Sequence, residues 1–213
     1  MYISECERAG CAASLFPNGF FERSQWLITM KTYTMTIAGK TRELPMFPIN
    51  DDLWIAAFIM FGDVEITVES AKALAKKVPE FDVIITAEAK GIPLAYEFAR
   101  ATGKNYIVAR KGPKLYMKDI ISTDVDSITT EAHQNLCLGS DEAEKIKGKK
   151  VLIIDDVIST GASLTAVEEL VKRCGGNICG KAAVLAEGEA ALRDDIIYLE
   201  KLPLFNSEGK PID

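Results

Sequence analysis

The fold of this chain is decided by the stretch Val151–Ser163, which reads VLIIDDVISTGAS. Its first four residues are apolar and predict a strand buried on both faces, as in a parallel sheet. Two acids and a run of small residues follow, and Leu164–Val171 then carries apolar residues at helical spacing until Gly175 and Gly176 end the pattern. The unit is therefore a strand, an acidic tip, a small-residue loop and a helix. In open α/β sheets ligands bind outside the carboxyl ends of the strands, which is where this loop lies.

The loop has the composition of a phosphate site beside a sugar site. A helix N-terminus offers backbone N–H groups and a favourable dipole to an anion, and Gly161 and Ala162 keep bulky side chains away from it. Asp155 and Asp156 are acceptors that could hold sugar hydroxyls or a hydrated cation. Alternatively, the two acids end the strand and cap the helix, although adjacent buried carboxylates repel each other. Further hydroxyl donors can come from Ser159, Thr160 and Ser163.

These residues closely resemble the signature of the type I phosphoribosyltransferases, which bind 5-phosphoribosyl 1-pyrophosphate (PRPP). The resemblance implies that Asp155 and Asp156 contact the ribose 2′ and 3′ hydroxyls and that Ser159–Ser163 holds the 5′-phosphate. It also implies the family's α/β fold, a mostly parallel twisted sheet flanked by helices with a small hood over the base site. The stretch is not a P-loop, because it has no Gly-Lys-Ser/Thr after a four-residue spacer.

The composition favours one globular domain in a reducing compartment. The chain has 213 residues, of which 48% are apolar and 26% charged, and its net charge of −6 argues against a general nucleic-acid binder. The apolar run Leu53–Phe61 is shorter than the roughly 20 residues that span a bilayer, and no secretory signal is evident, so we expect a cytoplasmic protein. A disulfide framework or a zinc site is not favoured by the spacing of the five cysteines: Cys6, Cys11, Cys137, Cys174 and Cys179.

Residues 1–29 differ from the rest of the chain, because they combine two cysteines, a Pro-Asn-Gly turn and aromatic residues without periodicity. Met30 is followed at once by an alternating strand pattern over Met30–Ile37. We interpret residues 1–29 as a non-core extension and residues 30–213 as one phosphoribosyltransferase domain. An ordered additional element at the N-terminus is the alternative.

The middle of the chain predicts a βαβ unit. Phe81–Thr86 and Asn105–Ala109 read as buried strands, with a helix over Ile92–Ala101 between them that Gly103 stops. This order predicts a parallel sheet, which Ile178–Leu185 and Ile196–Leu199 would complete. The carboxyl ends of these strands would bring loops 88–91 and 110–114 to the edge where Asp155 and Asp156 lie.

Other segments give weaker patterns. We expect a buried helix over Leu53–Phe58, capped by Asn50 or Asp51, and an amphipathic helix over Thr67–Val78. Gln134–Leu138 would be a short edge strand and Ser140–Lys150 a solvated surface turn. The C-terminus, with Pro203, Gly209 and Pro211, reads as a loose tail.

Two loops resemble the parts of the family that hold the diphosphate. Glu88-Ala89-Lys90-Gly91 is similar to its pyrophosphate loop, in which backbone N–H groups and an often cis peptide contact the diphosphate, and Ala89–Lys90 is the peptide expected to be cis. A plain strand-to-helix turn is the alternative. Arg110–Leu115 resembles the Arg-Lys-x-x-Lys-Leu segment of the adenine and xanthine branches, so Arg110, Lys111 and Lys114 would neutralise the leaving pyrophosphate.

Residues 112–131 lack strong periodicity, which is typical of an active-site lid. Adenine members carry a Tyr-x-Leu-Glu-Tyr-Gly segment whose Glu lies near the leaving groups. Matching by distance to Leu136 and Leu138 puts Thr130 at that position and Glu131 directly after it. Glu131 is therefore a catalytic candidate, and a solvated loop acid is its alternative. Ser127–Thr129 is more similar to the Ser-aromatic-Thr of the xanthine branch.

The base-binding residues are inferred from two segments. Residues 40–50 and the C-terminal segment would form the hood, in which Phe47 either stacks on the base or belongs to the core. Xanthine members carry Lys at the position that matches Glu187. A carboxylate there suits a donor such as the 6-amino group of adenine.

The resemblance implies a purine phosphoribosyltransferase that uses PRPP with Mg²⁺, favours adenine and acts as a homodimer in purine salvage. Its reaction would displace pyrophosphate from C1 of PRPP by a purine ring nitrogen. A xanthine or 6-oxopurine enzyme differs only in the base, and a PRPP-sensing regulator would bind the same ligand without turnover. A pyrimidine enzyme fits the Arg110-Lys111 segment less well.

Overall fold

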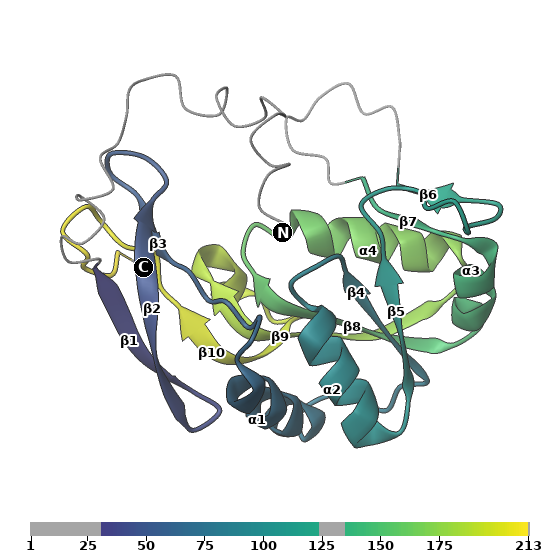
Figure 1. The fold of residues 1–213 in the computed structure, drawn as a ribbon, viewed down its shortest axis with the longest axis horizontal. Helices are drawn as coiled ribbons and strands as arrows, with labels where there is room; N and C mark the ends of the chain where they lie inside the picture. Colours follow the sequence, from purple (N-terminus) through teal and green to yellow (C-terminus); the bar gives the residue numbers. More distant parts are fainter. Residues whose placement is uncertain (1–30, 124–134, 213) are drawn as a thin grey trace, which may run out of the picture. The chain divides into compact units, whose positions relative to one another are not determined.

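The computed structural model describes residues 31–123 and 135–212, and the part of the chain from Thr32 forms one compact unit. At its centre lies a parallel five-stranded sheet in the order β10-β9-β8-β4-β5 (Figure 1). The predicted α/β fold with a parallel sheet is confirmed. Its strands are β4 (Val83–Ala87), β5 (Asn105–Ala109), β8 (Lys150–Ile158), β9 (Asn177–Glu187) and β10 (Ile197–Leu202).

Helices cover both faces of this sheet, which explains why β8 is apolar at consecutive positions. On one face α1 (Val64–Ala75) and α2 (Ile92–Thr102) pack over Leu152 and Ile154. On the other face α4 (Ala162–Arg173) packs over Val151 and Ile153. Successive side chains of a strand point to opposite faces, so each apolar residue of β8 enters one of two cores.

The hood is a three-stranded antiparallel sheet of β1 (Thr32–Ile37), β2 (Lys40–Pro48) and β3 (Trp54–Ala56). The helix predicted over Leu53–Phe58 is wrong, because Trp54–Ala56 pairs with Met46–Pro48 instead. Asn50, the expected helix cap, closes the hairpin: its side-chain oxygen accepts hydrogen bonds from the backbone N–H groups of Asp52 and Leu53, at 3.0 and 2.8 Å. The start of this apolar run is therefore a strand because it pairs with β2, a contact that its own sequence pattern does not show.

The C-terminal segment packs against the hood, so the prediction of a loose tail is wrong. Phe205 is fully buried, and its ring contacts that of Tyr33 at a centroid distance of 4.8 Å. Its backbone exchanges two hydrogen bonds with Trp54, of 2.8 and 2.9 Å.

Smaller differences concern element boundaries. Residues 140–146 form helix α3 (Ser140–Ile146) rather than a surface turn, because Ile146 is buried and the Glu142 carboxylate accepts from the Gly139 N–H at 3.0 Å. Helix α1 begins three residues before the predicted Thr67, because Asp63 caps it. The expected edge strand is β7 (Cys137–Leu138), paired with β6 (Ile121–Ser122). Within the described ranges no helix is long and apolar enough to cross a membrane.

Candidate active site

The loop predicted to bind the 5′-phosphate, which we call the phosphate loop, connects β8 to α4 at the carboxyl edge of the sheet. Gly161 is the N-cap residue of α4 and has a φ of +81°, a left-handed conformation that side-chain-bearing residues rarely adopt. Gly161 has no side chain with which to cap this helix, and the Ala162 N–H meets the Thr160 hydroxyl only at a long 3.5 Å, so the turn is suited to binding an anion. Ser159 and Ser163 line the adjoining cavity, while Thr160, Gly161 and Ala162 supply the backbone of the turn.

Asp155 and Asp156 lie within β8, which extends past them to Ile158 instead of ending before them. Asp156 is 4% exposed, and its Oδ2 atom has no hydrogen-bond partner among the described residues. An Oδ1 atom of Asp155 accepts from the backbone N–H of Asp156 at 2.9 Å. Burial raises the pKa of Asp155 well above its ordinary value, and the neighbouring Asp156 charge adds to this; burial also raises the pKa of Asp156. The unpartnered Oδ2 of the buried Asp156 can accept a hydrogen bond from a ligand or bind a cation.

The loop after β4 approaches β8 closely. Its cis peptide lies between Glu88 and Ala89, one residue before the expected Ala89–Lys90, so that prediction is wrong. A Cβ atom on Gly91 would overlap the Thr86 hydroxyl and would lie 2.7 Å from Asp155 Oδ1 and 3.3 Å from Asp155 Cα. Gly91 has an ordinary φ of −72°. Glycine is therefore required here by the approach of the loop to the acid pair and not by backbone strain.

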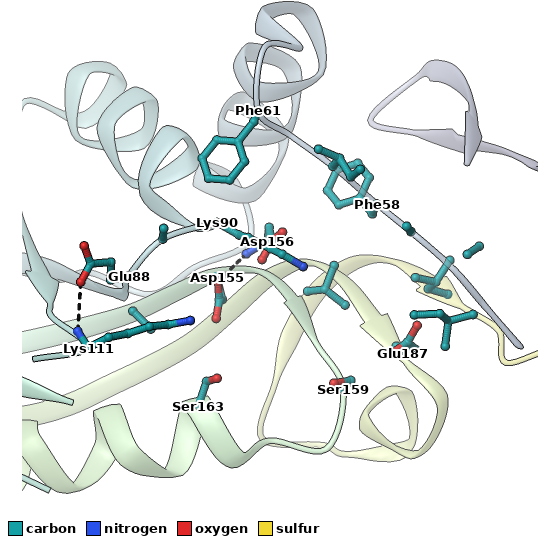
Figure 2. A pocket seen from close by; sticks show the side chains of 18 residues that line it. Phe58, Phe61, Glu88, Lys90, Lys111, Asp155, Asp156, Ser159, Ser163 and Glu187 are labelled. Atoms are coloured by element: carbon teal, nitrogen blue, oxygen red, sulfur yellow. Dashed lines mark hydrogen bonds between the residues drawn. The ribbon is translucent and has the colours of Figure 1, made fainter. Parts of the chain in front are cut away.

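Cationic side chains reach the same edge from β4 and β5. Lys90 and Lys111 line the cavity, and Lys90 lies beside the acid pair (Figure 2). Glu88 holds the two loops together: it accepts from the backbone N–H of Lys111 at 3.0 Å, and its other oxygen lies 3.6 Å from Arg110 Nη1. This hydrogen bond from Lys111 is the main reason that the pKa of Glu88 is lowered. Arg110 and the exposed Lys114 lie outside the cavity lining.

The cavity has a volume of about 670 Å³ and two chemically different sides. The polar side carries the acid pair, the two lysines and the two serines, and Glu187 joins it from the end of β9. In Figure 2 the rings of Phe58 and Phe61 lie across the cavity from Ser159 and Ser163. We call the apolar side the base wall, because a purine base is the substrate that the sequence predicts; it consists of Ile55, Ala56, Ala57, Phe58, Ile59 and Phe61.

The base wall was missed by the sequence analysis, because Leu53–Phe58 was expected to form a buried helix. Phe47, the predicted stacking residue, pairs with Ile55 in the hood but is not part of the lining. An apolar run that mixes three buried positions with exposed ones, such as Ile59 and Phe61 at 56% and 52%, carries no signal in sequence that separates a cavity wall from a core. Thr130 and Glu131 lie outside the described residues.

Comparison with known proteins agrees with this geometry. Residues 65–206 match the model of the phosphoribosyl transferase domain. The adenine phosphoribosyltransferase of Acetivibrio thermocellus is 32% identical over 180 residues, which cover 83% of this chain and 93% of the relative. That of Kosmotoga olearia is 31% identical over 153 residues, covering 68% and 84%.

Solved structures show the same fold. The adenine phosphoribosyltransferase of Thermoanaerobacter pseudethanolicus has a TM-score of 0.60 and 22% identity, over 74% of this chain and 95% of that one. The Leishmania tarentolae enzyme has a TM-score of 0.58 and 17% identity, over 84% and 88%. The chain matches the domain model, and it is similar in sequence to relatives over most of their length. It therefore belongs to the phosphoribosyltransferase family of enzymes.

Proposed function

We propose that this enzyme transfers the 5-phosphoribosyl group of PRPP to adenine, giving AMP and pyrophosphate, as in purine salvage. One observation carries the proposal: an acid pair, a glycine-initiated helix N-terminus and two lysines share a single cavity with an apolar wall. Such a cavity suits a ligand that is anionic at two points, hydroxylated between them and flat and apolar at one end. Relatives over most of the chain are named adenine phosphoribosyltransferases.

Each part of the cavity has a proposed role. The loop Ser159–Ser163 and the N-terminus of α4 bind the 5′-phosphate, because the backbone N–H groups at a helix N-terminus and the helix dipole favour an anion. Asp155 and Asp156 accept hydrogen bonds from the ribose 2′ and 3′ hydroxyls, which would satisfy the unpartnered Oδ2 of Asp156. The diphosphate lies against the backbone of residues 88–91. Its charge is offset by Lys90 and Lys111, with Arg110 and Lys114 at the rim.

These roles give a mechanism by positioning and charge stabilisation. As the bond from C1 to pyrophosphate breaks, positive charge develops on the ribose and negative charge on the leaving group. The carboxylates of Asp155 and Asp156 stabilise the first charge, and the lysines stabilise the second. The base wall holds the purine in line with C1, which removes most of the entropic cost of bringing two substrates together.

Mg²⁺ fits this site as a partner of PRPP. The described residues contain no cluster of three or more His, Cys, Asp or Glu side chains that could hold a metal alone. The buried, unpartnered Oδ2 of Asp156 is an oxygen donor of the kind that Mg²⁺ accepts together with phosphate oxygens and water. Bound there, the ion would offset charge on the leaving pyrophosphate. We further propose that residues 112–131 close over the site and that Glu131 acts near the leaving groups.

We propose that Glu187 selects the base. It lines the cavity at the end of β9, and a carboxylate accepts a hydrogen bond from the 6-amino group of adenine but repels a 6-oxo group. The test is incubation with PRPP, Mg²⁺ and a panel of nucleobases, with nucleotides identified by mass. We expect AMP from adenine and little product from xanthine, guanine or hypoxanthine. Product from a 6-oxopurine but not from adenine would refute the choice of base, and PRPP binding without turnover would favour a sensor.

Variants at Glu187 sharpen this test. Glu187→Lys should lower kcat/KM for adenine by about a hundredfold relative to the wild type, since the ammonium group, a hydrogen-bond donor, would then face the 6-amino group, which is also a donor. Glu189→Gln, two residues further on and exposed, is the matched control. Equal losses in the two variants would contradict a role for Glu187 in base selection.

We also propose that the enzyme is a homodimer in the cytoplasm. Exposed apolar side chains gather where α1 and α2 begin, among them Phe61, Val64 and Tyr96, and could be covered by a second copy. Cys174 and Cys179 carry free thiols, as is common in a reducing compartment. Light scattering coupled to gel filtration, and fractionation of the native source, test the two statements.

A further inference from the structure

A salt bridge joins the hood to the first helix of the core. The guanidinium of Arg42, on β2, contacts the carboxylate of Asp63 through two nitrogens: Nε donates to Oδ2 at 2.6 Å and Nη2 to Oδ1 at 3.0 Å. Nη2 also donates to Glu65 at 2.9 Å. Arg42 and Asp63 are only 26% and 28% exposed, so this two-nitrogen contact is partly shielded from water. We call this contact the hood latch.

Asp63 contacts other groups besides Arg42, among them Thr67, whose hydroxyl donates to the Asp63 carbonyl at 2.7 Å. Its Oδ1 accepts from the backbone N–H of Ile66 at 3.1 Å and so caps helix α1, and its own N–H donates to the carbonyl of Met60 at 3.0 Å. Arg42 lowers the pKa of Asp63, and Asp63 in turn raises the pKa of Arg42. The latch is therefore charged at neutral pH, and it ends at a residue that also determines the path of the preceding backbone.

The preceding backbone is the base wall. This segment leaves the hood at Ala56, where β3 pairs with Met46 of β2, and the Ala57 N–H donates to the Pro45 carbonyl at 2.8 Å. It ends two residues after Phe61, at Asp63. Residues 57–62 in between form no helix or strand themselves; Phe58 and Met60 are buried in the core, whereas Phe61 is 52% exposed. The position of the Phe61 ring in the cavity thus depends on how β2 and the start of α1 are held together, and Arg42 holds them directly.

We propose that Arg42 is a positioning residue for the nucleobase: it aligns the base wall through Asp63 without touching the substrate. This inference rests on the proposed function, because it assigns a base to the apolar side of the cavity. The inference predicts different effects on the binding of the two substrates. Loss of the latch weakens binding of the base and leaves the phosphate loop, which lies on β8 and α4, as it was.

The test compares Arg42→Met, Arg42→Lys and the wild type by steady-state kinetics and calorimetry. We expect the KM for adenine to rise about tenfold in Arg42→Met with the KM for PRPP unchanged, since small misplacements of a positioning wall weaken a bound ring. Affinity for AMP should fall by a similar factor, while affinity for ribose 5-phosphate, which lacks the base, stays the same. Arg42→Lys keeps the charge but loses the two-nitrogen contact, so it should recover only part of the loss.

Two further variants separate the latch from the helix cap and from general loss of charge. Asp63→Asn keeps a good N-cap residue but removes the charge, so it should reproduce the adenine defect of Arg42→Met. Lys72→Met removes an exposed ion pair with Glu69 on the same helix and should change neither KM.

The outcomes are distinct. An unchanged KM for adenine in a folded Arg42→Met variant, or equal losses for AMP and ribose 5-phosphate, would overturn the inference. If Arg42→Met does not fold, Arg42→Lys and Asp63→Asn carry the same comparison. A wild-type protein that binds ribose 5-phosphate but neither AMP nor adenine would instead overturn the proposed function, and the inference with it.

Discussion

Replacing Gly91 by alanine tests the closest approach in the candidate site. The added methyl group would overlap the Thr86 hydroxyl and lie 2.7 Å from Asp155 Oδ1 and 3.3 Å from Asp155 Cα. Thr86 is fully buried, and the Asp155 Cα atom belongs to the central strand, so neither can move away easily. The substitution therefore forces the loop away from β8 or displaces the Asp155 carboxylate.

The magnitude follows from two opposed terms. Because Gly91 has an ordinary φ, alanine restricts the unfolded chain and should by itself stabilise the protein by about 0.5–1 kcal/mol. Overpacking of a dense region costs about 1–3 kcal/mol. The net expectation is a loss of about 1–2 kcal/mol, which corresponds to a fall in Tm of about 3–6 °C for a chain of this size. PRPP affinity should fall as well, because Asp155 is displaced.

The assay is urea and thermal unfolding of the variant beside calorimetric titration with PRPP. Gly112→Ala is the matched control for stability: its φ is not left-handed and its Cβ would meet no atom within 4 Å, so no overpacking opposes the gain. A Gly91→Ala protein that is as stable as Gly112→Ala would refute the reasoning from close approach.

Three other perturbations have defined outcomes. Burial raises the pKa of Asp155, so its ionised form is less favoured in the folded protein than in the unfolded chain. The free energy of unfolding of Asp155→Asn should therefore equal that of the wild type below about pH 4 and exceed it progressively as the pH rises. A difference in urea unfolding that does not depend on pH would contradict this. Lys111→Met should weaken pyrophosphate binding about tenfold in calorimetry but leave the affinity for ribose 5-phosphate unchanged. Lys104→Met, remote from the cavity lining, should change neither affinity. Phe61→Ala should raise the KM for adenine but change the free energy of unfolding by less than about 1 kcal/mol, because the Phe61 side chain is 52% exposed. Phe58→Ala, at 5% exposure, should lower the free energy of unfolding by about 3 kcal/mol in denaturant titrations. Equal losses of stability would show that Phe61 belongs to the core.

The parts of the fold that could be predicted are those whose signal is local. In β4, β5 and β8 the buried runs are short and bounded by turn residues, and α2 ends where Gly103 takes a φ of +68°. The phosphate loop is equally local, since its small residues are adjacent in sequence. In all these elements, neighbours within a few residues decide the structure.

The parts that could not be predicted depend on distant partners. Trp54 joins a strand because Pro48 and Phe205 pair with it, and the second of these lies 151 residues further along the chain. Nothing in the pattern of residues 53–61 shows that their apolar side chains would face a cavity. The position of the cis peptide at Glu88–Ala89 likewise has no signature in side-chain type.

The central position of β8 has a consequence for how such an enzyme could change its substrate. Under the proposed assignment, the groups that all PRPP-dependent reactions share are held by β8 and β4, whereas the base meets Glu187 at the end of β9 and the base wall. Binding of the sugar phosphate and recognition of the base thus depend on different segments of the chain. A new base preference could be acquired by substitutions in two short stretches, without a compensating change in the machinery that activates the sugar.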